Sequence, residues 1–494
     1  MPQTNPSVTP GAPNTLDPSR TRPTREQAPP KIGWKQYVAD LVKAPAKAKT
    51  ALIGSLMLVA ISPSALSALT PFVVPAYAKK TGTPAPDAIL LFVTLPLLIG
   101  PLILPFAGRW ADRQGARRVA LPAVILYAIS MAVIPLAAGR IWLLGTLLIL
   151  AWIFGFAASL GVVFKVISTW FPAHRGIGFG LIGVASSLAS AILSPVLQWL
   201  VNGNAPAGPP AGSTPPAAAP GGAPPVSAAD PGVFMGLGWN GVYYVIAIAI
   251  AVVGIPAVLW LLSEPTVAAV GGAPKILEAK LPGVPLWQAV RGRAWIFVVL
   301  LLTLVSTGPV AIRQNAVDLY GQVGINSATV SLGLSVLFST SVVGLLLGGT
   351  ILDRARHPWI VAVLVATVPV GLALALINRG SVALLYVSMA LLGFATGAES
   401  ALGPALIARY CGLKSFGALQ GLSLAITGPA LAVAPYAVSD LHAVSGSYTT
   451  PLLALVVLTG IAVVIAASLP KYPPPWVLHL SKGDTGPDQP PTAR

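Results

Sequence analysis

The sequence predicts an all-α membrane protein whose twelve transmembrane helices form two related six-helix halves. The prediction rests on the composition, on the placement of the basic residues and on two motifs that recur at one spacing. Of the 494 residues, 55% are hydrophobic and only 9% are charged. Soluble domains carry about a quarter charged residues, so this chain lacks the polar surface that a soluble protein of its length needs. Lipid must therefore cover much of it.

Twelve apolar runs are long enough to cross a bilayer as helices, which takes roughly 20 residues each. Prolines inside these runs, such as Pro309 and Pro429, are tolerated because neighbouring helices and water satisfy the backbone groups that they free. The polar, proline-rich residues 1–50 are expected to form a disordered tail without a signal peptide. The expected spans lie near 51–77, 88–107, 119–138, 141–164, 176–200, 241–262, 294–317, 328–349, 359–378, 381–406, 415–438 and 451–469.

The basic residues test this division independently. When the loops are assigned alternately to the two sides of the membrane, 24 of the 30 Lys and Arg fall on one side and 5 on the other, with Lys165 inside a span. Basic loops face the cytoplasm, so both termini are expected on the cytoplasmic side. The expected location of the protein is the inner (cell) membrane of a bacterium. The net charge of +16 does not indicate a nucleic-acid partner, because the basic residues are spread thinly between apolar runs.

Two loops divide the chain. Residues 201–235 hold 9 Pro and 6 Gly but no Lys or Arg, which predicts a flexible outer loop. Residues 263–293 form a basic cytoplasmic linker between the halves. The expected organisation is an N-terminal bundle over 51–262, a C-terminal bundle over 294–470 and a cytoplasmic tail over 471–494.

The two halves share motifs at an offset of 241 residues. Gly108-Arg-Trp-Ala-Asp112-Arg113 follows the second span, and Gly349-Thr-Ile-Leu-Asp353-Arg354 follows the eighth. The same offset relates Gly176-x3-Gly180 to Gly417-x3-Gly421 at the starts of the fifth and eleventh spans. Two motifs at one offset are hard to obtain by chance. Parallel repeats of this kind are typical of facilitator-type transporters, whose substrate site lies between the halves.

The first of these motifs makes the similarity specific. The loop from Gly108 through Asp112, Arg113, Gly115 and Arg117 to Arg118 resembles the signature loop G-x-x-x-D-R-x-G-R-R of the major facilitator superfamily, and the loop from Gly349 to Arg356 resembles its degenerate second copy. The resemblance spans roughly 50–470 and implies the major facilitator fold. The segments 169–176 and 409–417 resemble those of bacterial members related to monocarboxylate and oxalate/formate carriers.

In that superfamily the signature loop is implied to be a conformational latch, which stabilises one access state without touching substrate. The alternative is basic charge that only fixes topology. The paired glycines Gly176, Gly180, Gly417 and Gly421 permit close helix packing in lipid. The expected latch residues are Gly108, Asp112, Arg113, Gly115, Arg117, Arg118, Gly349, Asp353 and Arg354.

Charges inside spans are costly, so each is a candidate functional residue. Arg313, in the seventh span after Pro309, can bind a carboxylate in a bidentate manner; alternatively it is interfacial or pairs with Asp318. Glu399, in the tenth span near mid-membrane, is a candidate for proton coupling, or a buried acid paired for structure. Lys165, near one end of the fourth span, can contact an anionic substrate or simply reach the interface.

The sequence holds no phosphate-binding loop, no H-E-x-x-H and no G-x-S-x-G, so no catalytic residue, cofactor or metal is expected. The single cysteine, Cys411, can form neither an internal disulfide nor a cysteine–metal cluster. The predicted function is secondary active transport of a small organic anion by a monomeric symporter or antiporter, with protons or a counter-substrate as the driving partner. The alternatives are a multidrug or metabolite efflux pump of the same superfamily and a non-transporting membrane receptor or channel.

Overall fold

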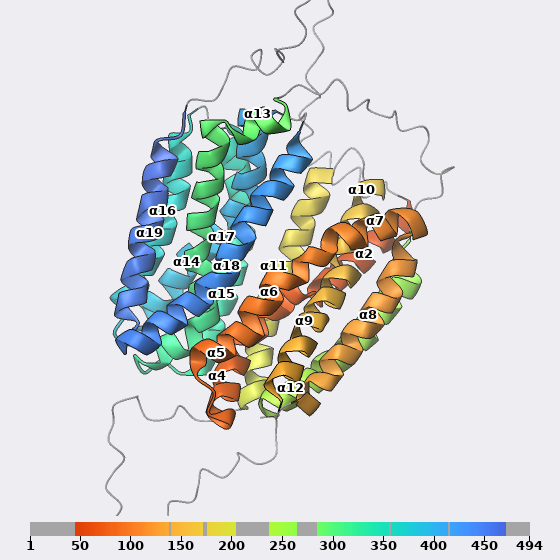
Figure 1. The fold of residues 1–494 in the computed structure, drawn as a ribbon, viewed down its shortest axis with the longest axis horizontal. Coiled ribbons are helices and arrows are strands. Elements are labelled where there is room, and N and C mark those ends of the chain that lie inside the picture. Colours follow the sequence, from red (N-terminus) through yellow and green to blue (C-terminus); the bar gives the residue numbers. More distant parts are fainter. Residues whose placement is uncertain are drawn as a thin grey trace, which may run out of the picture. The chain divides into compact units, whose positions relative to one another are not determined.

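The computed structural model describes residues 45–137, 140–170, 175–203, 237–263, 284–354, 357–412 and 415–470. Within these ranges, twelve helical segments are long and apolar enough to span a membrane, as the prediction required (Figure 1). The terminal tails and most of the segments 201–235 and 263–293 lie outside the described residues. The spans are Ala46–Thr81, Ala85–Ala111, Ala116–Ala137, Ile141–Ile167, Gly180–Asn202, Gly238–Leu261, Arg293–Gly321, Ser327–Gly349, Trp359–Leu376, Val382–Cys411, Leu419–Ser445 and Thr449–Ala467.

All the spans of the first half except the fifth are made of several helical pieces. The first half comprises α2 (Ala46–Ala60), α3 (Pro63–Leu66), the 3-10 helix η1 (Ser67–Leu69) and α4 (Thr70–Thr81); α5 (Ala85–Ile89), the π-helix η2 (Leu90–Thr94), α6 (Leu95–Ile99), the 3-10 helix η3 (Gly100–Ile103) and α7 (Leu104–Gln114); α8 (Ala116–Val133) and the 3-10 helix η4 (Ile134–Ala137); α9 (Ile141–Ala158) and α10 (Leu160–Trp170); α11 (Arg175–Asn202); and α12 (Gly238–Ala249) with the π-helices η5 (Ile250–Gly254) and η6 (Ala257–Leu261).

Two of the interruptions meet in space. Ser62 adopts extended backbone (φ −69°, ψ 160°), and its hydroxyl accepts from the amide of Ala65 to cap the helix that begins at Pro63. The fourth span is interrupted at Ser159, whose hydroxyl donates to the carbonyl of Gly155 at 2.6 Å. A Cβ added to Gly155 would lie 2.5 Å from Cγ of Pro63, so only glycine lets the broken first and fourth spans pack together.

Each span of the second half is, within the described residues, one uninterrupted α-helix. Prolines such as Pro309 and Pro404 lie inside these helices without ending them. A short helix, α13, precedes the spans at the end of the segment that we expected to be a linker. The helices are α13 (Leu286–Val290), α14 (Arg293–Gly321), α15 (Ser327–Arg354), α16 (Trp359–Leu376), α17 (Val382–Cys411), α18 (Phe416–Ser445) and α19 (Thr449–Ala467).

The closest helix packing is found between α15 and α17. A Cβ on Gly397 would overlap the carbonyl oxygen of Ser341, and one on Gly344 would overlap that of Phe394. Gly348 and Gly393 complete a glycine pair on each helix, spaced four residues apart. Two backbones can approach this closely only where side chains are absent.

The glycines that the sequence singled out for packing do not lie at such contacts in this conformation. A Cβ added to Gly180 or to Gly421 would meet no atom within 4 Å. The side-chain surroundings of Gly176 and Gly417 lie outside the described residues. A small-x3-small spacing is thus met in several spans, and only the rotation of each helix decides which pair faces a neighbour.

The halves contact each other through a seam of small polar residues on α11 and α15. The hydroxyl of Ser341 donates to that of Ser187 at 3.0 Å, and Ser335 donates to the carbonyl of Ala191 at 2.7 Å. Ser194 donates to the carbonyl of Ser331 at 3.2 Å. We call these contacts the serine seam.

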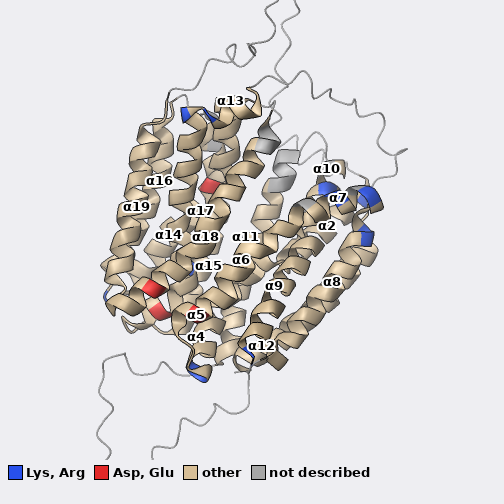
Figure 2. Ribbon diagram, viewed as in Figure 1, with Lys and Arg blue, Asp and Glu red and all other residues tan. Residues whose placement is uncertain are grey.

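Basic residues gather at one end of the helices, near the α7–α8 connection and α13 (Figure 2). We call this the basic end, marked by Arg113, Arg117, Arg118, Arg291 and Arg293, and the other the opposite end. The serine seam lies in the half of α15 that begins at the opposite end, since α15 starts there at Ser327. The assignment of the basic end to the cytoplasm stays a prediction.

Candidate substrate and coupling site

Arg313 lies in α14, one helical turn after Pro309. Its guanidinium carbon Cζ is 5.8 Å from the centre of the Phe338 ring on α15, a distance at which a cation is attracted to an aromatic face. Its Nε is buried and, among the described residues, has no hydrogen-bond partner. No ion pair with Asp318 is present in the described part of the chain. The charge is therefore oriented by an aromatic ring without being neutralised by an acid.

A contact between the halves adjoins this arginine. The buried hydroxyl of Thr70, the first residue of α4, donates to the side-chain carbonyl of Gln314 on α14. Gln314 follows Arg313 directly, so the backbone of Arg313 lies next to the point where the first and seventh spans touch. At the repeat offset of 241 residues, Arg313 corresponds to Phe72, which is buried in the same region of α4.

Glu399 lies on α17 and accepts a hydrogen bond from the hydroxyl of Ser306 on α14. Within the described residues no Lys or Arg pairs with it. Ser306 and Arg313 are seven residues apart, which places them on one face of α14 about 10 Å from each other. Glu399 therefore contacts the face of α14 that carries Arg313, two turns away from Arg313. The two charged groups are not in contact.

Lys165 occupies a different position from the one we expected of a substrate ligand. Its ammonium group donates to the carbonyl of Ala111 in the last turn of α7. In the second half Arg409 donates in the same way to the carbonyl of Leu352. Ala111 and Leu352 are separated by 241 residues, the repeat offset, and each directly precedes the aspartate of its loop motif. Lys165 and Arg409 are thus equivalent cations that hold the ends of the second and eighth spans.

Sequence reasoning did not select Arg409, because it was counted as a loop charge. The usable signal was its position, one helical turn beyond Leu406, the residue that matches Lys165 at the repeat offset. Cations near a helix C-terminus are stabilised by the helix dipole and can bind its last free carbonyls.

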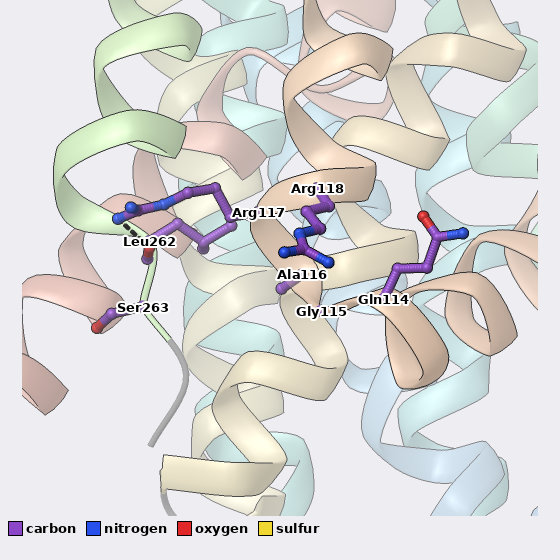
Figure 3. Close-up of a pocket in the computed structure, with 7 residues that line it drawn as sticks. All are labelled: Gln114, Gly115, Ala116, Arg117, Arg118, Leu262 and Ser263. Carbon is purple, nitrogen blue, oxygen red and sulfur yellow. Dashed lines mark hydrogen bonds between the residues drawn. The ribbon is translucent and has the colours of Figure 1, made fainter. Parts of the chain in front are cut away.

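The signature loop turns sharply at Gly115, which has φ 90° and ψ 149°. This conformation is strained for any residue with a Cβ, and it lets α8 begin directly after α7 ends. Beyond it, Nη2 of Arg117 donates to the carbonyl of Leu262 at 3.0 Å and so ties the loop to the end of the sixth span. A cavity of about 570 Å³ lies at this point. The residues that line it, drawn in Figure 3, are Gln114, Gly115, Ala116, Arg117, Arg118, Leu262 and Ser263.

Other latch residues are described only in part. A Cβ on Gly108 would lie 3.9 Å from the carbonyl of Gly161, and one on Gly349 would lie 3.9 Å from Cβ of Ala401. These are ordinary contacts of the second span with the fourth and of the eighth with the tenth. The side chains of Asp112, Asp353 and Arg354 lie outside the described residues, while that of Arg113 is exposed.

Comparison with known proteins identifies the family. The sequence profile of the Major Facilitator Superfamily matches residues 55–313, slightly more than half of the chain. The chain belongs to the major facilitator superfamily. Members of this superfamily are transporters of small molecules, so the chain is a membrane transporter and not an enzyme. No curated protein matched in a separate comparison.

Solved structures share the major facilitator fold at low sequence identity. A bacterial homologue of the human lysosomal transporter Spinster, inward-facing and unoccupied, superposes with a TM-score of 0.60 at 13% identity over 88% of this chain and 98% of its own. The occupied form gives 0.62 at 14% identity over 86% and 96%. A point mutant of the nucleoside transporter NupG gives 0.62 at 12% over 85% and 99%. At such identities the likeness establishes the fold alone.

Proposed function

We propose that this major facilitator protein is a secondary active transporter that moves a small, monocarboxylate-like organic anion by alternating access, driven by protons or by exchange. The observation that carries the proposal is the unpaired guanidinium of Arg313 beside the contact between the halves. Arginine remains charged even when buried, and an unpaired charge inside a membrane protein is costly. A bidentate carboxylate is the ligand that best offsets this cost.

Two further features support the proposal. Glu399 is an acid with no basic partner among the described residues. It contacts, through Ser306, the face of α14 that carries Arg313, so it is the candidate for proton coupling. The cations Lys165 and Arg409 hold the two loop motifs at equivalent places, which favours a latch that stabilises one access state. The serine seam closes the halves at the opposite end, as expected of a molecule whose site opens toward the basic end.

A binding screen tests the substrate class. Purified protein is heated with formate, acetate, lactate, pyruvate or oxalate, and its melting temperature is recorded. A ligand that binds only the folded protein stabilises it by about 2.7 kcal/mol at 100 times its Kd. We expect at least one of these acids to raise Tm.

Substitutions of Arg313 locate the effect. Arg313→Lys keeps the charge but loses the bidentate geometry, so we expect its affinity for the stabilising acid to fall by about tenfold or more, which is about 1.4 kcal/mol. Arg313→Ala should still insert and fold, because Arg313 makes no ion pair in the described structure. Arg379→Lys, at an exposed turn, is the control. Unchanged affinity in both Arg313 variants contradicts the assignment.

An efflux pump for amphipathic cations is the second candidate, and the unpaired acid Glu399 is the observation that favours it. Stabilisation by a lipophilic cation such as tetraphenylphosphonium, lost in Glu399→Gln, would select this function over anion transport. Binding without flux into proteoliposomes would indicate a receptor, and flux that does not saturate would indicate a channel.

A further inference from the structure

A line of polar residues runs between α14 and α18 from the opposite end toward the level of Arg313. Asn315, Asp318 and Gln322 follow one another at three and four residues, so they lie on one face of α14. Ser439 and His442 lie in the same way on the facing side of α18. We call these five residues the polar ladder.

Contacts across the interface fix the two ends of the ladder. Nδ2 of Asn315 donates to the carbonyl of Pro435 on α18 at 3.2 Å. At the other end, Nε2 of Gln322 lies 2.9 Å from Nε2 of His442, and the amide N–H donates to the ring. The carboxylate of Asp318, between these contacts, interacts electrostatically with His442. The ladder therefore spans two helical turns, or about 10 Å.

Several atoms of the ladder are buried without a partner in the described structure. They are Oδ1 of Asn315, Oγ of Ser439 and Nδ1 of His442. Asn315 is 2% exposed and Ser439 is 1% exposed. No hydrogen bond from a described residue reaches the carboxylate of Asp318. Buried polar groups are almost always hydrogen-bonded, if not to protein then to ordered water, so this row of open donors and acceptors indicates water molecules between the helices.

The imidazole of His442 lies against an aromatic ring near the ends of two helices. Its ring is stacked on that of Tyr448, with centres 3.9 Å apart and planes 6° from parallel. Both helices end here, α14 at Gly321 and α18 at Ser445, and helix C-termini attract cations. Burial and then the charge of Asp318 raise the pKa of the Tyr448 hydroxyl, so this ring stays neutral beside the histidine.

Other charged groups at this end do not join the ladder. Asp87 on α5, Asp440 on α18, and Lys79 and Lys80 on α4 are exposed. None forms an ion pair with a ladder residue in the described part of the chain. The only acid that faces His442 from a packed helix is, among the described residues, Asp318.

The internal repeat argues that the ladder is not needed for packing. At the offset of 241 residues, Asn315, Asp318 and His442 correspond to Val74, Tyr77 and Val201. The equivalent positions of α4 and α11 in the first half thus carry two valines and a tyrosine, and that half folds without an acid or a histidine there. Polar groups inside a membrane are retained where function requires them.

We propose that the polar ladder is a hydrated proton path from the opposite end of the bundle, and that Asp318 binds the proton that drives transport, with His442 as its entry point. The proposal rests on the proposed function, since it names the proton site of that transporter. It adds to Glu399 a second acid on the far side of Arg313, so that the two acids flank the candidate anion site along α14.

Infrared difference spectroscopy tests the proton site without a substrate. Acidification of the protein in lipid should produce a carboxylic-acid C=O band that is missing in Asp318→Asn. The band should be retained in Asp440→Asn, which removes the exposed acid on α18. The band should shift promptly in D₂O, because water reaches the group. A spectrum of Asp318→Asn that equals that of the wild type overturns the proposal, as does an Asp318 band that does not exchange.

Transport in proteoliposomes tests the coupling. Exchange of a labelled acid from the panel of formate, acetate, lactate, pyruvate and oxalate, without a pH gradient, should continue in Asp318→Asn and His442→Gln. Accumulation driven by a pH gradient should fall by about tenfold, within the usual range of coupling between two sites. Ser439→Ala should show a smaller loss, and Asp440→Asn none. Full accumulation in both Asp318→Asn and His442→Gln overturns the proposal. If the wild type exchanges none of the acids, the proposed function fails, and the infrared result alone decides on the ladder.

Discussion

At the scale of single residues, the molecule places few charges inside its membrane spans and gives each a different surrounding. Arg313 faces an aromatic ring, Glu399 accepts from a hydroxyl, and Lys165 holds a backbone carbonyl. Of these three contacts, only that of Lys165 is a hydrogen bond from a cation to the protein backbone. In the proposed function, the partners of the other two are an anion for Arg313 and a proton for Glu399, both from outside the protein.

Glu399→Gln tests the role of that acid. The amide can still accept from Ser306 but cannot release a proton, so gradient-driven accumulation of the transported acid should be lost while exchange continues. Uptake and counterflow in the same proteoliposomes measure the two activities. Ser306→Ala is the matched control, because it removes the hydrogen bond and keeps the carboxylate. Normal accumulation by Glu399→Gln would rule out proton coupling at this position.

The sequence revealed these charges because a charge among apolar residues is conspicuous. It did not reveal their partners Phe338 and Ser306, which are ordinary residues on other helices. Such contacts depend on how far each helix is rotated and shifted along its neighbour, and hydropathy carries no information on either. For the same reason the sequence singled out Lys165 but not its contact with Ala111.

At the scale of helices, the contact between α15 and α17 shows how tight packing can hold part of the site. Each helix of this pair supplies one partner to α14. Phe338 on α15 lies against Arg313, and Glu399 on α17 accepts from Ser306. The glycines Gly344, Gly348, Gly393 and Gly397 let the two backbones touch. A small change there should move both partners of α14 together.

A pair of identical substitutions tests this packing. In Gly397→Ala the new methyl group overlaps the carbonyl of Ser341, so the protein should lose about 1–3 kcal/mol of stability. In Gly421→Ala the methyl group meets open space, and the helix should be unchanged or gain up to about 1 kcal/mol. Melting temperatures of the two purified variants measure the difference. Equal values would show that α15 and α17 do not pack as described.

Lys165→Ala distinguishes a latch from a substrate contact. If the cation only holds the end of α7, the variant should change the transport rate and leave the affinity for the stabilising acid within about twofold. Arg409→Ala should behave alike, since it makes the equivalent contact in the other half. Affinity from thermal shift and turnover from counterflow separate the two effects. A loss of affinity in Lys165→Ala alone would restore the interpretation as a substrate ligand.

Prediction of the helices themselves succeeded where length and hydropathy decide. All twelve spans were found, and the ninth and twelfth agree with the expected ranges to within two residues at each end. The tenth span runs on to Cys411, five residues past its expected end, and Arg409 within it donates to the carbonyl of Leu352 on α15. The interruption at Ser62 has a readable signal, a serine cap before Pro63. The one at Ser159 has none, because it follows from packing between the fourth and first spans.

At the scale of the whole molecule, the halves meet through hydroxyl groups and small side chains. Each bond of the serine seam is an ordinary neutral hydrogen bond, worth about 0.5–1.5 kcal/mol. A contact of this kind can hold one state and still be broken in a transport cycle. It contrasts with the α15–α17 contact inside the second half, where the described glycines bring backbone against backbone.

Cross-linking tests whether the serine seam must open. Ser187→Cys with Ser341→Cys, in a Cys411→Ser background that removes the chain's own cysteine, should form a disulfide, since the two hydroxyl oxygens lie 3.0 Å apart. Oxidation should abolish transport, and a reductant should restore it. Each single cysteine variant, treated in the same way, is the control. Transport that persists in the cross-linked protein would show that the seam stays closed throughout the cycle.

The unequal continuity of the two halves has a mechanical consequence. An uninterrupted helix carries a displacement along its whole length, whereas a helix broken at Ser62 or Ser159 bends at the break and passes little on. A ligand that shifts α14 at Arg313 therefore acts on a stiff body, and the first half is the compliant one that accommodates it. The second half is thus the stiffer of the two. Substitutions that make the helices continuous at Ser62 or Ser159 should slow turnover more than equally large changes in the second half.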